Sequence, residues 1–142
     1  MQMSWQSWAL LSALFAGMTA LLAKVGVDEL APSYATLVRT VVILIIVAGI
    51  WIGAGAPMAN TFSSAKVVGA LVLSGIATGL SWACYFQALK LGDAVRVAPL
   101  DKLSVVLVVV FGVIFLGERL DAKGWVGTGL IAAGAVLLAF RR

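Results

Sequence analysis

The stretch Ala94–Leu116 is hydrophobic enough to cross a membrane, yet it carries charges in its first third. Its uncharged part, Leu103–Leu116, has only about 14 residues, which span roughly 21 Å as an α-helix. The hydrocarbon core of a bilayer needs about 30 Å, or some 20 residues. A spanning helix must therefore include Pro99, Asp101 and Lys102. Ionisable groups at that depth usually face a protein interior or a water-filled cavity, so the stretch predicts a membrane protein with a polar pocket.

Composition agrees with a membrane protein and leaves little room for catalysis. The chain is 63% hydrophobic and 11% charged, with a mean hydropathy of +1.11, whereas soluble domains are about 25% charged. It has no His and one Cys, which excludes an intrachain disulfide framework and disfavours hydrolase triads and zinc sites. We therefore expect no enzyme activity, no cofactor and no metal. The basic residues lie singly at the edges of apolar segments, which indicates membrane anchors rather than nucleic-acid binding.

Five apolar segments with short connections predict an all-α, polytopic membrane protein with a single domain over residues 1–142. The first segment lacks a basic region before it and a small-residue cleavage site after it, so we expect a spanning helix rather than a signal peptide. Segments of about 20 apolar residues fit helices and not a barrel. The expected helices cover about 7–23, 34–52, 67–89, 96–116 and 125–140.

Arg39 and Asp101 are predicted to lie at similar depth in the second and fourth helices. Because helix directions alternate, both would lie toward the same leaflet. A mid-helix arginine costs about 2.5–3.5 kcal/mol on insertion and so demands a partner. We predict an Arg39–Asp101 pair, or two side chains that face a shared aqueous vestibule. The alternative is that Arg39, Arg96 and Lys102 extend to lipid phosphates while Asp101 merely neutralises a neighbour.

Three further residues are weaker candidates for the lining of a substrate site. Trp82 and Tyr85, three apart, share a helix face and could form an aromatic wall for a cationic or amphipathic substrate; the alternative is ordinary packing. Pro99 would either open the fourth helix at its first turn or kink it inside the membrane. Backbone carbonyls freed by a proline are tolerated where a helix lines a cavity.

Small residues four positions apart suggest how helices pack against one another or against a second copy. The third helix has Gly75 and Gly79, and the fifth has Gly129 and Ala133, with Gly127 beside them. Such spacings allow close approach of two backbones. The chain has 15 glycines, so each spacing is weak evidence by itself.

Several motifs together resemble an EamA-type domain of the drug/metabolite transporter superfamily. They are Lys24, Pro32 and Arg39 in order, then YFQALKLG, APLDKLSVV, FLGERL and the glycine-rich GWVGTGLIAAGAVLLAF. FLGE with the glycine-rich segment is the most specific part. The resemblance implies one half of a ten-helix, inverted-repeat transporter, in the five-helix bacterial and archaeal branch. A lone half is then expected to pair with an inverted copy of itself in the inner membrane, around a central substrate cavity.

Charged residues test this expectation weakly. The basic residues of the loops divide three against four between the two sides of the membrane. This is nearly balanced, as dual topology requires. Counting helix starts gives three against seven, which favours an external N-terminus. The side that bears the N-terminus has Lys66, Arg119 and Lys123. The opposite side has Lys24, Lys90, Arg141 and Arg142, and the larger count adds Arg39, Arg96 and Lys102 to it.

The resemblance has one departure that bears on mechanism. The four-helix small multidrug resistance proteins use a carboxylate deep in the first helix, and here the corresponding LLSALFAGMTALLA has no acid. Proton coupling, if present, would fall to Asp101. We expect a homodimeric transporter that moves a small metabolite or an amphipathic or cationic solute by alternating access. A non-transporting membrane scaffold that packs through the fifth helix is the alternative, and a membrane enzyme is a weaker third.

Overall fold

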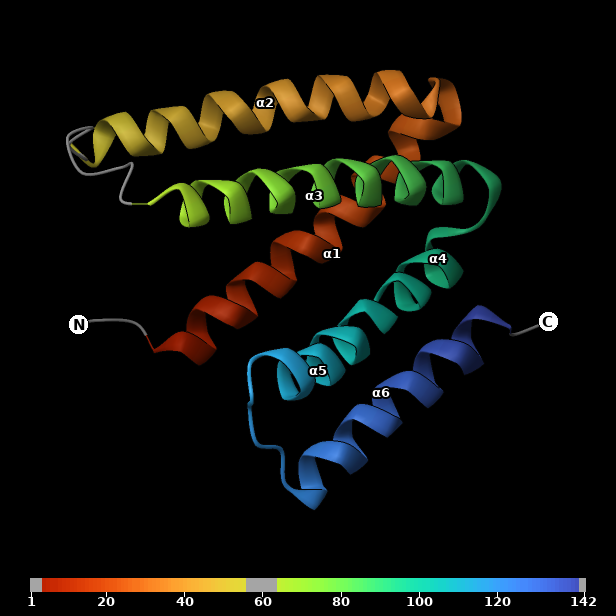
Figure 1. Cartoon of the computed structure of the whole chain (residues 1–142). Helices are drawn as coiled ribbons and strands as arrows, with labels where there is room; N and C mark the ends of the chain where they lie inside the picture. The colour runs from red at the N-terminus through yellow and green to blue at the C-terminus, as the bar shows by residue number, and fades with distance from the viewer. Residues whose placement is uncertain (1–3, 56–63, 141–142) are drawn as a thin grey trace. The chain divides into compact units, whose positions relative to one another are not determined.

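The computed structural model describes residues 4–55 and 64–140, and all regular structure within them is α-helical (Figure 1). Five helical spans are long and apolar enough to cross a membrane, because α4 and α5 together form one span, Ala94–Phe115. The prediction of an all-helical protein with about five spans is confirmed. The helices are α1 (Trp5–Glu29), α2 (Pro32–Gly53), α3 (Ala65–Leu91), α4 (Ala94–Asp101), α5 (Leu103–Phe115) and α6 (Ala122–Ala139).

The chain divides into two compact units. Unit 1 comprises Met1–Lys24 and Leu91–Arg142, and unit 2 comprises Val25–Lys90. The division falls inside α1, whose last residues belong to unit 2. That the chain forms a single domain remains a prediction.

Unit 2 is built around the antiparallel pair α2 and α3 (Figure 1). Pro32 occupies the first turn of α2, where its missing N–H leaves no helical bond unmade. Two threonines inside α2 satisfy their own hydroxyls: Thr36 Oγ1 donates to the Pro32 carbonyl and Thr40 Oγ1 to the Thr36 carbonyl, each at 2.8 Å. These polar side chains therefore need no partner from another helix.

The buried residues of unit 2 gather toward one end of the hairpin. Val27, Phe86 and Leu89 are almost fully inaccessible. At the same end, Lys90 Nζ donates to the carbonyl of Asp28 at 2.9 Å, near the C-terminus of α1. A lysine there satisfies a carbonyl that the ending helix leaves without a helical partner. Lys90, expected only as a membrane anchor, thus also fastens α1 to α3.

Unit 1 contains the α4–α5 span packed against α6 (Figure 1). Pro99 lies within α4, which begins at Ala94, so the prediction that Pro99 opens the helix at its first turn is wrong. The helix is instead interrupted just after it, at Lys102. There the Lys102 N–H bonds to the Pro99 carbonyl and the Val105 N–H to the Lys102 carbonyl, each at 3.0 Å and three residues apart. Pro99 itself has no N–H to donate to the carbonyl of Val95, four residues earlier, so the regular helical bonds are already incomplete before this point.

The FLGE segment forms the turn that ends α5. Gly117 has φ +70°, a left-handed conformation that glycine adopts without steric cost. The N–H groups of Leu116 and Glu118 both bond to the Gly112 carbonyl, at 3.1 and 3.2 Å. Asp121 then caps α6, because its side chain accepts a hydrogen bond from the Gly124 N–H at 2.8 Å. The motif therefore sets a tight connection between two spans.

Candidate functional site

Arg39 and Trp82 lie at similar depth in the α2–α3 hairpin. Seven residues separate Arg39 from the start of α2, a rise of roughly 10 Å, and nine separate Trp82 from the end of α3, roughly 14 Å. Because the helices are antiparallel, both distances are measured from the same end of the hairpin. A hydrocarbon core has a half-thickness of about 15 Å, so helices that begin and end at its edges would place both residues inside it.

The Arg39 guanidinium lies over aromatic rings of α3. Its Cζ atom is 4.3 Å from the centroid of the Trp82 ring and 5.5 Å from that of Phe86. Trp82 and Phe86 are four residues apart and so share a helix face. A cation over a ring face gains about 0.5–1 kcal/mol when exposed and about 2 kcal/mol when desolvated. The rings thus stabilise the charge that the sequence places inside a span.

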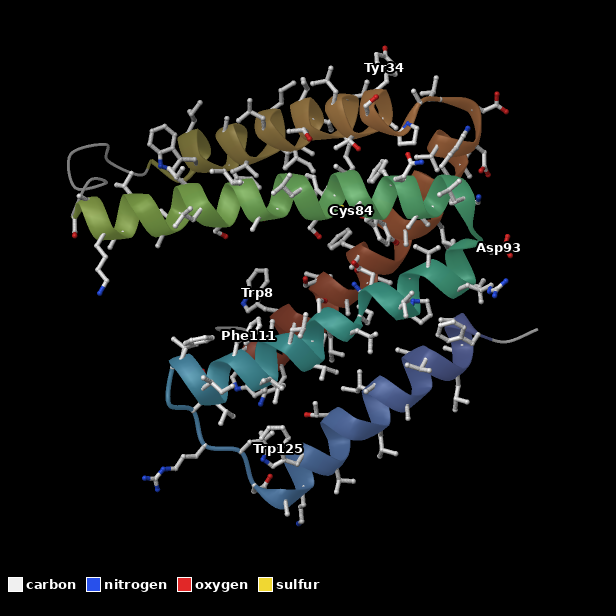
Figure 2. All side chains as sticks on the ribbon, turned by 45° about the vertical axis from the view of Figure 1, so that its right-hand side comes forward. Trp8, Tyr34, Cys84, Asp93, Phe111 and Trp125 are labelled. Atoms are coloured by element: carbon white, nitrogen blue, oxygen red, sulfur yellow. The ribbon has the colours of Figure 1, made fainter. Side chains whose placement is uncertain are left out.

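Tyr34 and Arg39 lie on different faces of α2. Tyr34 points away from α3 and is 55% exposed, whereas Arg39, five residues later, turns toward α3 (Figure 2). The orientation follows from helix periodicity, because five residues rotate the side-chain direction by about 140°.

Tyr85 extends the aromatic group. Its ring meets that of Phe86 edge to face, with centroids 6.3 Å apart and an interplanar angle of 69°. The structure therefore brings Arg39, Trp82 and Tyr85 together around Phe86, which sequence reasoning left out of the site. The four-residue spacing of Trp82 and Phe86 was the available signal. We call these four residues the arginine–aromatic cluster.

Pro99 and Asp101 belong to unit 1, whereas the arginine–aromatic cluster belongs to unit 2. Asp101 Oδ2 lies 3.4 Å from Lys102 Nζ, with the two side chains 35% and 56% exposed. This contact matches the alternative in which Asp101 neutralises a neighbour. The Arg39–Asp101 pair would join residues of the two units and stays a prediction.

Arg96 has a partner within the protein. Its Nε donates to the carbonyl of Ala139 at 3.0 Å, at the C-terminus of α6. A cation there also meets the negative end of the helix dipole. The alternative in which Arg96 extends to lipid phosphates stays a prediction for its remaining N–H groups.

The small residues divide by helix face. Thr128, Ala135 and Ala139 are the buried side chains of α6, whereas Ala133 is exposed. Among the described residues, no atom lies within 4 Å of a Cβ built on any of the four predicted packing glycines, Gly75, Gly79, Gly127 and Gly129. Helix packing inside unit 1 therefore uses a different face of α6. The predicted glycine positions stay candidates for contact with a second copy.

The described residues contain no group of three or more His, Cys, Asp or Glu side chains that could hold a metal ion. Cys84 is a free, exposed thiol on α3 (Figure 2). The arginine–aromatic cluster thus consists of one guanidinium and three aromatic rings. Such groups can bind and orient a solute.

Residues 3–140 match the EamA-like transporter family. The chain belongs to this family. It is 56% identical over 139 residues to a Sinorhizobium protein named "Uncharacterized transporter in cobO 3'region", a match that covers 98% of this chain and 99% of the relative. No solved structure matches the chain. The predicted resemblance is confirmed, and the protein is a multi-pass membrane transporter rather than an enzyme.

Proposed function

We propose that the protein is a secondary transporter of a small metabolite or amphipathic solute, working by alternating access as a homodimer of inverted copies in a prokaryotic inner membrane. The observation that carries the proposal is the Arg39 guanidinium over Trp82 at 4.3 Å, roughly 10 Å inside a membrane-spanning helix. A charge at that depth is costly and belongs where solute or water passes.

Two observations support the homodimer. The described residues supply five spans, half of the ten that the resemblance implies for larger relatives. Gly75 and Gly79 of α3 and Gly127 and Gly129 of α6 have space for another backbone beside them.

Each unit by itself holds candidate substrate-contacting residues. In unit 2, Arg39 with Trp82 and Tyr85 supplies a charge and aromatic faces. In unit 1, Pro99 and Asp101 belong to the interrupted α4–α5 span, and helix breaks of this kind commonly accompany a cavity. Asp101 is the proposed coupling carboxylate, because it is the acid of that span and the first span has none before Asp28.

A non-transporting scaffold is the second candidate. It rests on the exposed face of α6 around Gly129 and Ala133, which another membrane protein could cover. A scaffold would not need the charge of Arg39 inside the membrane, so removing that charge separates the two functions.

Uptake of a defined metabolite mixture into proteoliposomes, read by mass spectrometry, tests the proposal. We expect wild-type vesicles to accumulate at least one compound above empty vesicles. Arg39→Gln and Asp101→Asn should abolish that uptake while the proteins still elute as a single species. Lys66→Gln, at the start of α3, is the matched control and should retain uptake.

Equal contents in wild-type and empty vesicles would contradict transport. Normal uptake by both folded variants would contradict the site. Variants that only fail to fold would make Arg39 and Asp101 structural.

A further inference from the structure

Arg39 has strong hydrogen-bond donors that its aromatic neighbours do not use. A guanidinium carries five N–H donors around the edge of its plane, and a ring face is at most a weak acceptor. The guanidinium of Arg39 lies over the rings of Trp82 and Phe86, and its charge also interacts with Tyr85. The rings therefore stabilise the charge and leave the donors to be satisfied by something else.

The helical backbones of α2 and α3 offer Arg39 no free acceptor. At this depth the backbone carbonyls of both helices are engaged in their own helical bonds. Asp101 already has a cation beside it, since Lys102 Nζ lies 3.4 Å away. A group that brings its own oxygens to Arg39 would be favoured, because charge-assisted bonds strengthen where water is scarce.

The surroundings of Arg39 define the rest of such a group. Trp82 and Tyr85 are half-buried and present ring surface beside it. The indole face expected to attract a cationic solute is occupied by the protein's own cation. A second cation would be repelled there, and an apolar body could lie along the remaining ring surface.

We infer that Arg39 selects a small organic anion, binding its carboxylate in bidentate fashion while Trp82 and Tyr85 contact an apolar body. The inference rests on the proposed transport function and names the substrate class of the same site. The guanidinium fork matches the planar geometry of a carboxylate, which a lysine ammonium does not. The aromatic rings hold the fork in place before the anion arrives.

Three probes of nearly equal shape test the sign of the charge: benzoate, benzamide and benzamidine, which carry a negative, neutral and positive head group. Their binding to the full chain in phosphatidylcholine nanodiscs is measured by calorimetry. We expect wild type to bind benzoate about tenfold more tightly than benzamide, the gain typical of a charge-assisted bond, and benzamidine more weakly still. Arg39→Gln should bring benzoate within about twofold of benzamide, because it removes that gain.

The matched control is Arg96→Gln, which removes the arginine charge of α4 that bonds to the Ala139 carbonyl, and it should keep the benzoate preference. Arg39→Lys should bind benzoate less tightly than wild type but still better than benzamide. If Arg39→Gln does not elute as a folded species, the wild-type order and Arg39→Lys decide the matter.

Benzamidine binding as tightly as benzoate would overturn the inference. So would an unchanged benzoate preference in folded Arg39→Gln, or no benzoate binding up to about 10 mM, a very weak affinity for any site. Uptake of another solute alongside such a result would leave transport standing and remove the anion assignment alone. Benzoate binding in the predicted order without uptake of any solute would instead remove the transport proposal alone.

Discussion

At the scale of single residues, Arg39 is the position where sequence and structure are most informative together. The sequence locates it inside a span and predicts that it needs a partner. In the structure the partners are Trp82 and Phe86, which lie 43 and 47 residues after position 39 in the chain. Neither helix alone specifies that contact, because it depends on how α2 and α3 rotate against one another.

A double-mutant cycle measures how strongly Arg39 and Trp82 are coupled. Trp82→Leu and Arg39→Leu should each change the free energy of unfolding, and the double variant should deviate from their sum by about 1 kcal/mol in favour of the native pair. Unfolding in detergent is followed by far-ultraviolet circular dichroism, which reports helix content and does not depend on the tryptophan signal. The control cycle pairs Arg39→Leu with Trp125→Leu, at the start of α6, and should be additive. Full additivity in both cycles would mean that the ring does not stabilise the charge.

At the scale of elements, span positions follow directly from the sequence, whereas interruptions and faces do not. The fourth span was predicted over 96–116 and is helical from Ala94 to Phe115, with its break at Lys102. Hydropathy is averaged over a stretch of neighbouring residues, so it cannot locate a single altered hydrogen bond. Likewise the glycine spacing of α6 suggested Gly129 and Ala133, but Thr128 and Ala135 face the neighbouring helices. In a lipid-facing helix both sides are apolar, so polarity does not mark the packed side.

The turn after α5 gives a prediction at this scale. Gly117→Ala places a Cβ on a residue with φ +70° and should lower stability by about 1 kcal/mol, because that conformation favours glycine. The comparison is Gly69→Ala inside α3, where a Cβ meets no described atom within 4 Å. That change should be neutral or stabilising, since alanine is the better helix former. Thermal unfolding of both variants in one detergent provides the measurement; equal effects would contradict the role of the turn.

At the scale of the whole molecule, the chain covers little of its own apolar surface. Leu21, Leu44 and Leu73, on three different spans, are 64%, 67% and 68% exposed. Side chains of this kind need lipid or another chain around them. The family and the number of spans could be read from the sequence because both depend on local motifs and segment lengths. The partner could not be predicted, because small residues at an interface with another chain have the same composition as small residues that face lipid.

In the proposed transporter two copies lie in opposite orientations, and the orientation of the C-terminus tests this arrangement most directly. In a Cys84→Ala background, a single cysteine placed after Arg142 is labelled in intact cells with a membrane-impermeant thiol reagent, and again after permeabilisation. Two opposite orientations in equal amounts predict that about half of the sites react before permeabilisation and all of them afterwards. Labelling of all sites, or of none, in intact cells would show one orientation and contradict the inverted homodimer.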